Sequence, residues 1–185
     1  MSKMLYQAVF LSALVAMVAC ARSSSTDGTR VEYKLFNFTH AGKLQNGEKC
    51  DFGTHCDPSL RGYVDTISPD AAFPGSEDNL ERWAKIWEGL DIKDTARLNK
   101  IVSRDVCKGT YNKATLRVQV DEVDSSRKDL MEQFMCYAGR NVQQDESRAK
   151  WSELAECEAH YNKRGNKMLY SWRAFTVPAR DCGKV

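Results

Sequence analysis

The chain has little of what enzymes and nucleic-acid-binding proteins commonly depend on. Its 185 residues include only three histidines, and its 27 lysines and arginines are nearly balanced by 25 aspartates and glutamates. A net charge so close to zero gives no electrostatic basis for binding a polyanion. We therefore expect no nucleic-acid partner.

Catalytic and metal-binding motifs are also missing from the sequence. It contains no Gly-x-Ser-x-Gly, His-Glu-x-x-His, phosphate-loop or dinucleotide-binding pattern. It has no Cys-x-x-Cys, and His40, His55 and His160 are far apart along the chain, which argues against a zinc site. We predict that the protein is not an enzyme and requires no cofactor, since any catalytic site would have to be assembled from residues distant in sequence.

Only one long apolar run occurs, and it lies at the N-terminus. Lys3 precedes the uncharged stretch 5–19, and Ala19-Cys20-Ala21 is a small-x-small cleavage pattern. The run of about 15 residues is shorter than the roughly 20 that a membrane-spanning helix needs. We predict a signal peptide over residues 1–21 and a secreted, extracellular protein without a membrane anchor. The alternatives are an uncleaved signal anchor and a bacterial lipidation site at Cys20.

Six cysteines remain after removal of the signal peptide, because Cys20 leaves with it. An even number of cysteines in an exported chain predicts three disulfides. The sequence does not choose among the pairings, although Cys50 and Cys56 would close a short local loop. The six residues are Cys50, Cys56, Cys107, Cys136, Cys157 and Cys182.

The remainder predicts one domain, since its length suffices for one hydrophobic core and not for two. Residues 22–30 contain no apolar side chain and are expected to form a flexible leader before a domain over residues 31–185. Apolar and polar residues alternate in several segments, which is the pattern of half-buried strands. These segments are 31–36, 63–67, 114–120 and 168–177.

Two other segments suggest helices. Ser76 to Asn79 precede a stripe of apolar residues spaced by three and four, which predicts a capped amphipathic helix with its tryptophans in the core. That stripe is Leu80, Trp83, Trp87 and Leu90. Residues 130–137 fit either a helix or an ordered loop. Strands at the start, middle and end of the chain favour a mainly β fold, an antiparallel β-sandwich with one or two short helices in its connections.

Two local motifs indicate surface chemistry. Asn37-Phe38-Thr39 is an acceptor for N-glycosylation in the secretory pathway. Asp121 and Asp124 lie in an acidic turn after the central strand, and their carboxylates would supply part of a calcium shell. The alternative is a solvated acidic turn, since basic residues follow immediately.

Three patches of the sequence resemble the N-terminal domain of Notch ligands of the Delta/Serrate/Jagged type. The first extends from Tyr33 through the Asn46-Gly47 turn to Cys50 and Cys56. The other two are 114–126 and the pair 151–154 and 169–175. The resemblance implies a C2-like β-sandwich. Residues 58–113 depart from the family pattern, and one cysteine of its opening cluster is missing.

The resemblance also implies a binding function. In such ligands this domain faces the receptor, and its loops bind calcium and membrane phospholipid. Because we expect no anchor and no following cysteine-rich module, we predict a secreted co-ligand or modulator in Notch signalling. Its expected partners are an extracellular protein such as the Notch receptor and a phospholipid surface. The alternative is a secreted disulfide-rich binding protein unrelated to Notch, such as a lipid, glycan or inhibitor module.

Overall fold

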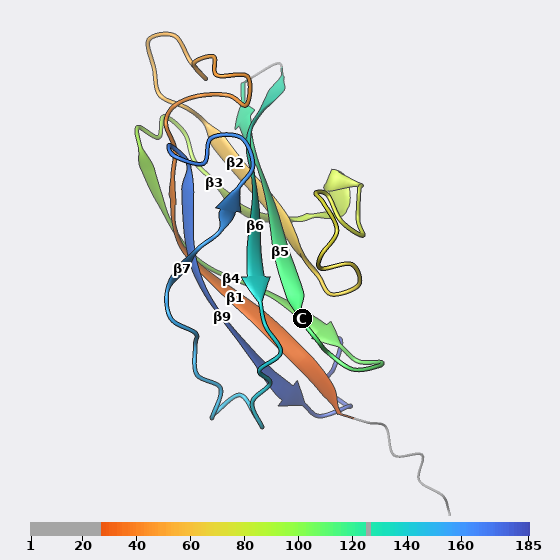
Figure 1. Ribbon diagram of the computed structural model, residues 1–185. Coiled ribbons are helices and arrows are strands. Elements are labelled where there is room, and N and C mark those ends of the chain that lie inside the picture. Colours follow the sequence, from red (N-terminus) through yellow and green to blue (C-terminus); the bar gives the residue numbers. More distant parts are fainter. Residues whose placement is uncertain (1–26, 125–126) are drawn as a thin grey trace, which may run out of the picture.

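Two antiparallel β-sheets pack face to face in the computed structural model, which describes residues 27–124 and 127–185 (Figure 1). The first sheet has the order β4 (Thr95–Val106), β1 (Gly28–Thr39), β9 (Lys167–Val177) and β7 (Ala155–Glu156). The second has the order β3 (Ala84–Glu88), β2 (Pro58–Asp65), β5 (Ala114–Val123), β6 (Lys128–Ala138) and β8 (Glu158–Ala159). The predicted antiparallel sandwich is confirmed.

The core lies between the sheets and is built from alternate residues of the long strands. Val31, Tyr33 and Leu35 of β1 are completely buried, as the alternation of that segment predicted. The apolar residues of β5, including Leu116 and Val118, are equally buried in the opposite sheet. Each such aliphatic side chain stabilises the fold by about 1.5–3 kcal/mol through removal of apolar surface from water.

The predicted strands are present, but their first and last residues differ from the predicted ones. β1 begins at Gly28, so the last three residues of the predicted leader belong to the sheet, where Gly28 pairs with Val177 of β9. The predicted strand over 63–67 corresponds to β2, which starts earlier and stops at Asp65. The segments 114–120 and 168–177 correspond to β5 and β9.

The predicted helix after Ser76 is wrong. A single 3-10 turn, Leu80–Arg82, occupies its start, and Asn79 caps that turn by accepting a hydrogen bond from the Glu81 N–H. The chain then extends into β3, which hydrogen-bonds along β2. Pairing with the edge of β2 satisfies the backbone N–H and C=O groups of this segment. Asn79 therefore caps a single 3-10 turn rather than a longer helix. Trp83 is nevertheless in the interior, at 2% exposure.

Residues 130–137 form neither a helix nor a loop but most of β6. A β-bulge explains the error, because the β5–β6 register shifts beside Asp121 and the buried residues Met131 and Phe134 are three apart. Beyond the bulge Phe134, Cys136 and Ala138 alternate regularly into the core. The three-residue step mimics helical spacing in the sequence.

Three disulfides staple the described part of the chain, as the cysteine count predicted. Cys50 and Cys56 close the local loop between β1 and β2. Cys107, after β4, pairs with Cys182 near the C-terminus, and Cys136 of β6 pairs with Cys157 between β7 and β8. The predicted signal peptide, residues 1–21, lies outside the described residues. No helix within residues 27–124 and 127–185 is long and apolar enough to cross a membrane.

The connection between β2 and β3 is held against the second sheet by a buried ion pair. Arg117 and Asp65 have fully buried side chains, with 3.1 Å between Nε and Oδ2. Arg117 also donates to the carbonyl oxygens of Ser68 and Ala71, while Asp65 accepts from the N–H of Ile67 and other groups of this connection. This arrangement anchors a long connection that has little regular structure of its own.

Three connections gather at one end of the sandwich, which we call the loop end (Figure 1). They are residues 40–57 between β1 and β2, 89–94 between β3 and β4, and 160–166 between β8 and β9. Asp124 and Arg127, which follow β5 and precede β6, lie there as well. The start of β1 and the end of β9 lie at the opposite end. The loop end is therefore at the opposite end of the sandwich from Gly28, where β1 starts, and Val177, where β9 ends.

Candidate functional site

The Cys50–Cys56 disulfide places two aspartates side by side at the loop end. Asp51 follows Cys50 and Asp57 follows Cys56, so the bridge that joins the cysteines also brings the two carboxylates together. Hydrogen bonds to the β3–β4 connection fix Asp57 further, because its Oδ1 accepts from the Asp91 N–H at 2.6 Å. Covalent and hydrogen-bonded constraints thus define where both acids lie.

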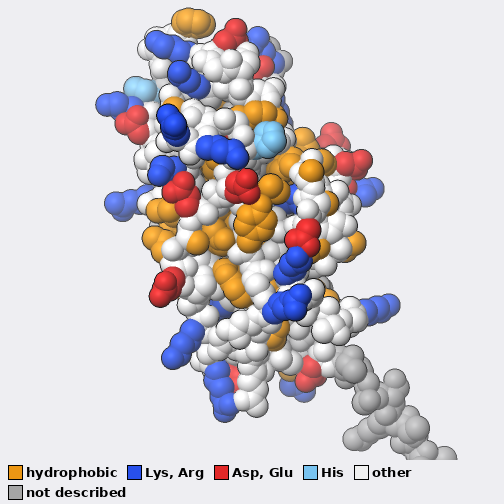
Figure 2. Space-filling model, viewed as in Figure 1, with side chains coloured by type: hydrophobic (Ala, Val, Ile, Leu, Met, Phe, Trp, Pro, Cys, Tyr) orange, Lys and Arg blue, Asp and Glu red, His pale blue; other side chains and the backbone are white. Residues whose placement is uncertain are grey.

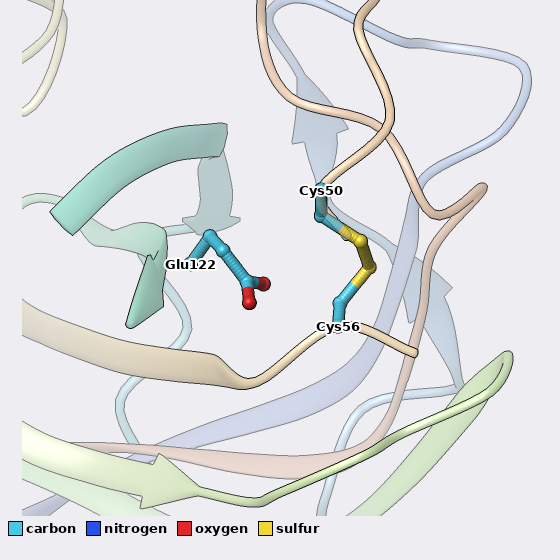
Figure 3. A group of neighbouring side chains, drawn as sticks. All are labelled: Cys50, Cys56 and Glu122. Carbon is cyan, nitrogen blue, oxygen red and sulfur yellow. A yellow bond between two sulfur atoms is a disulfide. The ribbon is translucent and has the colours of Figure 1, made fainter. Parts of the chain in front are cut away.

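Glu122 completes an acidic cluster with these two aspartates. It lies on the core-facing side of β5, and its carboxylate points toward the Cys50–Cys56 disulfide (Figure 3). Its side chain is almost fully buried, and both of its oxygens accept from the Asp57 N–H at 2.9 Å. One oxygen from each of Asp51, Asp57 and Glu122 lies within 4.8 Å of the others.

The surroundings of Glu122 disfavour a negative charge. Burial raises the pKa of this carboxyl to about 7, and the charges of Asp51, Asp57 and Asp124 raise it as well, while the hydrogen bond from Asp57 acts in the opposite direction. A bound cation would reverse this effect, because it would supply the opposite charge that the cluster lacks.

The geometry of the three acids fits a calcium ion. Calcium binds oxygens at about 2.3–2.6 Å, so two ligands of one ion lie at most about 5 Å apart. The spacing of Asp51, Asp57 and Glu122 meets that limit, and carboxylates are the hard oxygen ligands that calcium prefers. The neighbouring sulfur atoms are not ligands, since both belong to a disulfide.

The structure separates the two predicted calcium ligands. Asp121 lies on the opposite face of β5 from Glu122, where it accepts a hydrogen bond from Gln119 Nε2 at 2.9 Å. Burial raises the pKa of its carboxyl. Asp124 lies at the loop end, 3.7 Å from Arg127 Nε, and lines an open depression of about 610 Å³ together with Asp51. Of the two, only Asp124 is next to the acidic cluster.

Sequence reasoning missed Asp51, Asp57 and Glu122 as candidate ligands. A signal was nevertheless present, since the chain repeats the dipeptide Cys-Asp at Cys50-Asp51 and Cys56-Asp57. A local disulfide between these cysteines brings the residues that follow them close together. Glu122 follows directly after the predicted ligand Asp121, and strand alternation places the two on opposite faces.

Exposed apolar and basic side chains surround the acidic cluster. Phe52 is 94% exposed beside Asp51, and Leu90 is 74% exposed in the β3–β4 connection. Lys43, Lys49 and Lys93 line a shallow cavity of about 260 Å³ next to the Cys50–Cys56 loop. Basic side chains are spread over the loop end, at the top of Figure 2. The loop end therefore carries two exposed apolar side chains, Phe52 and Leu90, which we call the apolar tips, together with nearby lysines.

The predicted glycosylation site lies on the first sheet, away from this cluster. Asn37 is half-buried in β1 at a register irregularity and pairs with Arg97 of β4. The hydroxyl of Thr39, the third residue of the acceptor, lies 3.1 Å from that of Thr95. Asn37 remains a predicted acceptor.

Comparison with solved structures assigns the architecture. A C2 domain protein from Ramazzottius varieornatus matches with a TM-score of 0.78 and 25% sequence identity, covering 85% of this chain and 94% of that one. The fold is C2-like. This confirms the fold that the resemblance implied. No protein-family model and no curated protein matches the sequence.

More distant structures share only the fold. The Drosophila C2-DSL-EGF1 structure matches with a TM-score of 0.50 and 14% identity, covering 80% of this chain and 67% of that one. Human GIVD cytosolic phospholipase A2 matches with a TM-score of 0.51 and 10% identity, covering 83% of this chain but 18% of that one. At such identities the likeness concerns architecture and carries no site residue across.

Proposed function

We propose that this protein is a non-enzymatic, extracellular C2-like binding domain whose loop end binds calcium and docks on phospholipid membranes. The observation that carries the proposal is the convergence of Asp51, Asp57 and Glu122 in the same group of loops as the exposed side chains of Phe52 and Leu90. Three disulfides support an extracellular address, since such bonds persist in oxidising compartments.

Membrane docking follows from the two kinds of side chain at the loop end. Phe52 and Leu90 would bury apolar surface in the acyl region, which favours binding by about 25 cal/mol for each Å² removed from water. Each lysine near an anionic surface adds about 1 kcal/mol, and three lie at this end. Calcium would neutralise the acids that otherwise repel anionic headgroups.

Vesicle binding tests the docking surface. Purified protein should co-sediment with phosphatidylserine-containing vesicles in the presence of calcium, and the double variant Phe52→Ala/Leu90→Ala should bind at least about tenfold more weakly because it loses both apolar tips. Ile67→Ala is a matched control, since Ile67 is 73% exposed but follows β2 at the end away from the loop end. Equal loss in the control, or no loss in the double variant, would contradict the proposed surface.

Calcium titration tests the acidic cluster separately. Calcium should raise the melting temperature of the protein, because a ligand that binds only the folded state stabilises it. Asp51→Asn should weaken calcium binding by about tenfold or more, while Asp78→Asn, a change at an exposed acid of the β2–β3 connection, should not. Calorimetry that detects no calcium binding to the wild-type protein would remove this part of the proposal.

Binding to the Notch receptor is a second candidate function. It is favoured by the three patches that resemble Notch-ligand N-terminal domains and by the structural likeness to Drosophila C2-DSL-EGF1. On this proposal the protein acts as a co-ligand or modulator rather than as an autonomous activator. The membrane proposal does not depend on it.

Surface plasmon resonance with immobilised Notch extracellular repeats tests the receptor. Saturable binding, with or without calcium, would support the Notch proposal. Absence of binding in both conditions would remove it and would favour a secreted lipid-binding protein unrelated to Notch, provided that vesicle binding is observed.

A further inference from the structure

A small cavity lies along the edge of β9, in the half of the first sheet away from the loop end. β7 pairs only with Leu169 and Tyr170, so beyond these residues β9 has no strand on that side. Two loop residues take its place: Ser152 donates its N–H to the Trp172 carbonyl at 2.8 Å, and Gln143 donates to the Ala174 carbonyl at 2.8 Å. The cavity between them has a volume of about 240 Å³, and we call it the β9 pocket.

Four of the polar side chains that line the β9 pocket are free to bind a ligand. Within the described residues, no hydrogen bond or ion pair engages the side-chain amides of Asn141 and Gln143, the ammonium of Lys150, or the indole N–H of Trp151. These groups are solvent-accessible rather than buried and orphaned. Together they offer donors and acceptors within one small space.

The backbone contributes one more donor. Alternate residues of an antiparallel strand bond to the same neighbour, and both Trp172 and Ala174 bond to the loop side of β9. The Ala174 N–H therefore faces the pocket, where no described residue accepts a hydrogen bond from it. Such a donor on a rigid strand is fixed in position before a ligand arrives.

Trp151 forms an aromatic wall whose orientation is set by Arg173. The guanidinium carbon lies 4.7 Å from the centre of the indole ring, a distance at which a cation is attracted to the ring face. Arg173 is itself held by Glu32 at 2.7 Å and Glu146 at 3.0 Å. These two carboxylates balance the charge of Arg173, and the exposed ammonium of Lys150 is a donor that can also bond the hydroxyls of an uncharged ligand.

We propose that the β9 pocket binds one uncharged sugar ring of a glycan. A sugar ring presents an apolar C–H face, which matches an indole surface, and hydroxyl groups that both donate and accept, which match the amides of Asn141 and Gln143. The volume is below the roughly 300–1,000 Å³ of pockets for drug-sized ligands, and it suits a single ring. The pocket is remote from the loop end, so it does not depend on calcium or lipid.

Saturation-transfer NMR on the whole secreted protein tests this site. The probes are the methyl glycosides of glucose, galactose, mannose and N-acetylglucosamine, with glucuronic acid as a charged comparison. At least one neutral glycoside should bind with a dissociation constant of about 1 mM. The absence of binding by every neutral glycoside, or binding by glucuronic acid alone, would overturn the proposal.

Variants locate the binding in the β9 pocket. Asn141→Ala/Gln143→Ala should weaken glycoside binding at least about tenfold, since it removes two hydrogen-bonding amides without touching the backbone bonds of Gln143. Gln144→Ala is the matched control, because this amide lies outside the pocket and contacts Arg148. Trp151→Ala should abolish binding, and its melting temperature reports whether the domain remains folded. Unchanged affinity in the double variant would contradict the assignment.

Discussion

At the scale of single residues, the buried Arg117–Asp65 pair dictates what its neighbours can be. Gly75 has a φ of 87°, and a Cβ atom added there would collide with both members of the pair. Gly53 has a similar φ of 93°, but a Cβ there would meet no other atom within 4 Å. The two glycines therefore share a backbone constraint and differ in their surroundings.

This difference gives a direct stability test. Gly53→Ala should cost about 1–2 kcal/mol, the strain of a left-handed residue. Gly75→Ala should cost more, on the order of 3 kcal/mol or above, because it also disturbs a buried ion pair. Urea denaturation of the two variants measures both free energies of unfolding. Equal losses would show that the pair does not constrain the connection.

Asp65 also gives the protein a specific dependence on acid. Burial alone would raise the pKa of Asp65, but hydrogen bonds from Ser68, Ser76 and Ile67 outweigh it and lower the pKa to about 2. A carboxyl whose pKa is lower in the folded state contributes stability above its unfolded value. That contribution is lost as the pH falls from about 4 to 2.

The expected acid effect is about 2 kcal/mol for this one group. Asp65→Asn should therefore lower the free energy of unfolding at pH 7 and make it less dependent on pH between 4 and 2. Chemical denaturation across that range measures the difference from wild type. A variant with the same slope as wild type would assign the acid sensitivity to other carboxyls.

At the scale of elements, regular alternation decides which strands the sequence predicts. β1, β5 and β9 carry it over long segments, and all three were predicted. β4 was not predicted, because Asn99 has a φ of 44° and the register with β1 shifts at that point. Lys100 and Arg104 also interrupt the series of apolar residues Ala96, Leu98, Val102 and Val106, which pack against the core. Bulges depend on the paired strand and are therefore hidden in a single segment.

The candidate site was predicted less completely than the fold, and for a related reason. The acidic turn marked the correct end of β5, and Asp124 does lie beside the cluster. Asp51 and Asp57 are far from this acidic turn in sequence. They come close to it because of the Cys50–Cys56 disulfide and because Asp57 accepts a hydrogen bond from the β3–β4 connection. No local sequence pattern predicts that Asp51, Asp57 and Glu122 come together, although the repeated Cys-Asp dipeptide indicates that the two aspartates do.

The Cys50–Cys56 disulfide should contribute more to calcium binding by the acidic cluster than to the stability of the fold. It closes a loop with a sequence separation of six, so it restricts the unfolded chain less than Cys136–Cys157, with a separation of 21. Cys50→Ala/Cys56→Ala should weaken calcium binding by about tenfold or more while lowering stability less than Cys136→Ala/Cys157→Ala does. Calorimetry and thermal melting measure the two effects. Unchanged calcium affinity would show that the bridge does not position Asp51.

At the scale of the whole molecule, the two proposed binding sites lie at different places on one rigid sandwich. The loop end carries the acidic cluster and the apolar tips, while the β9 pocket opens on the first sheet toward the other end. The net charge is close to zero, so electrostatic attraction to a membrane arises from the local lysines rather than from the protein as a whole. Because the two proposed sites do not overlap, we expect that binding at one leaves the other accessible.

The Cys107–Cys182 disulfide has a mechanical consequence. β9 ends at Val177, opposite Gly28, so tension across these two points would unzip β1 from β9 one pair at a time. Beyond Val177 the chain is bonded covalently to Cys107, which follows the last residue of β4, the strand on the other side of β1. A pulling force applied to the chain at Cys182 is therefore shared between β9 and β4, the two strands that flank β1. A covalent bond, rather than the outermost hydrogen bonds, bears it first.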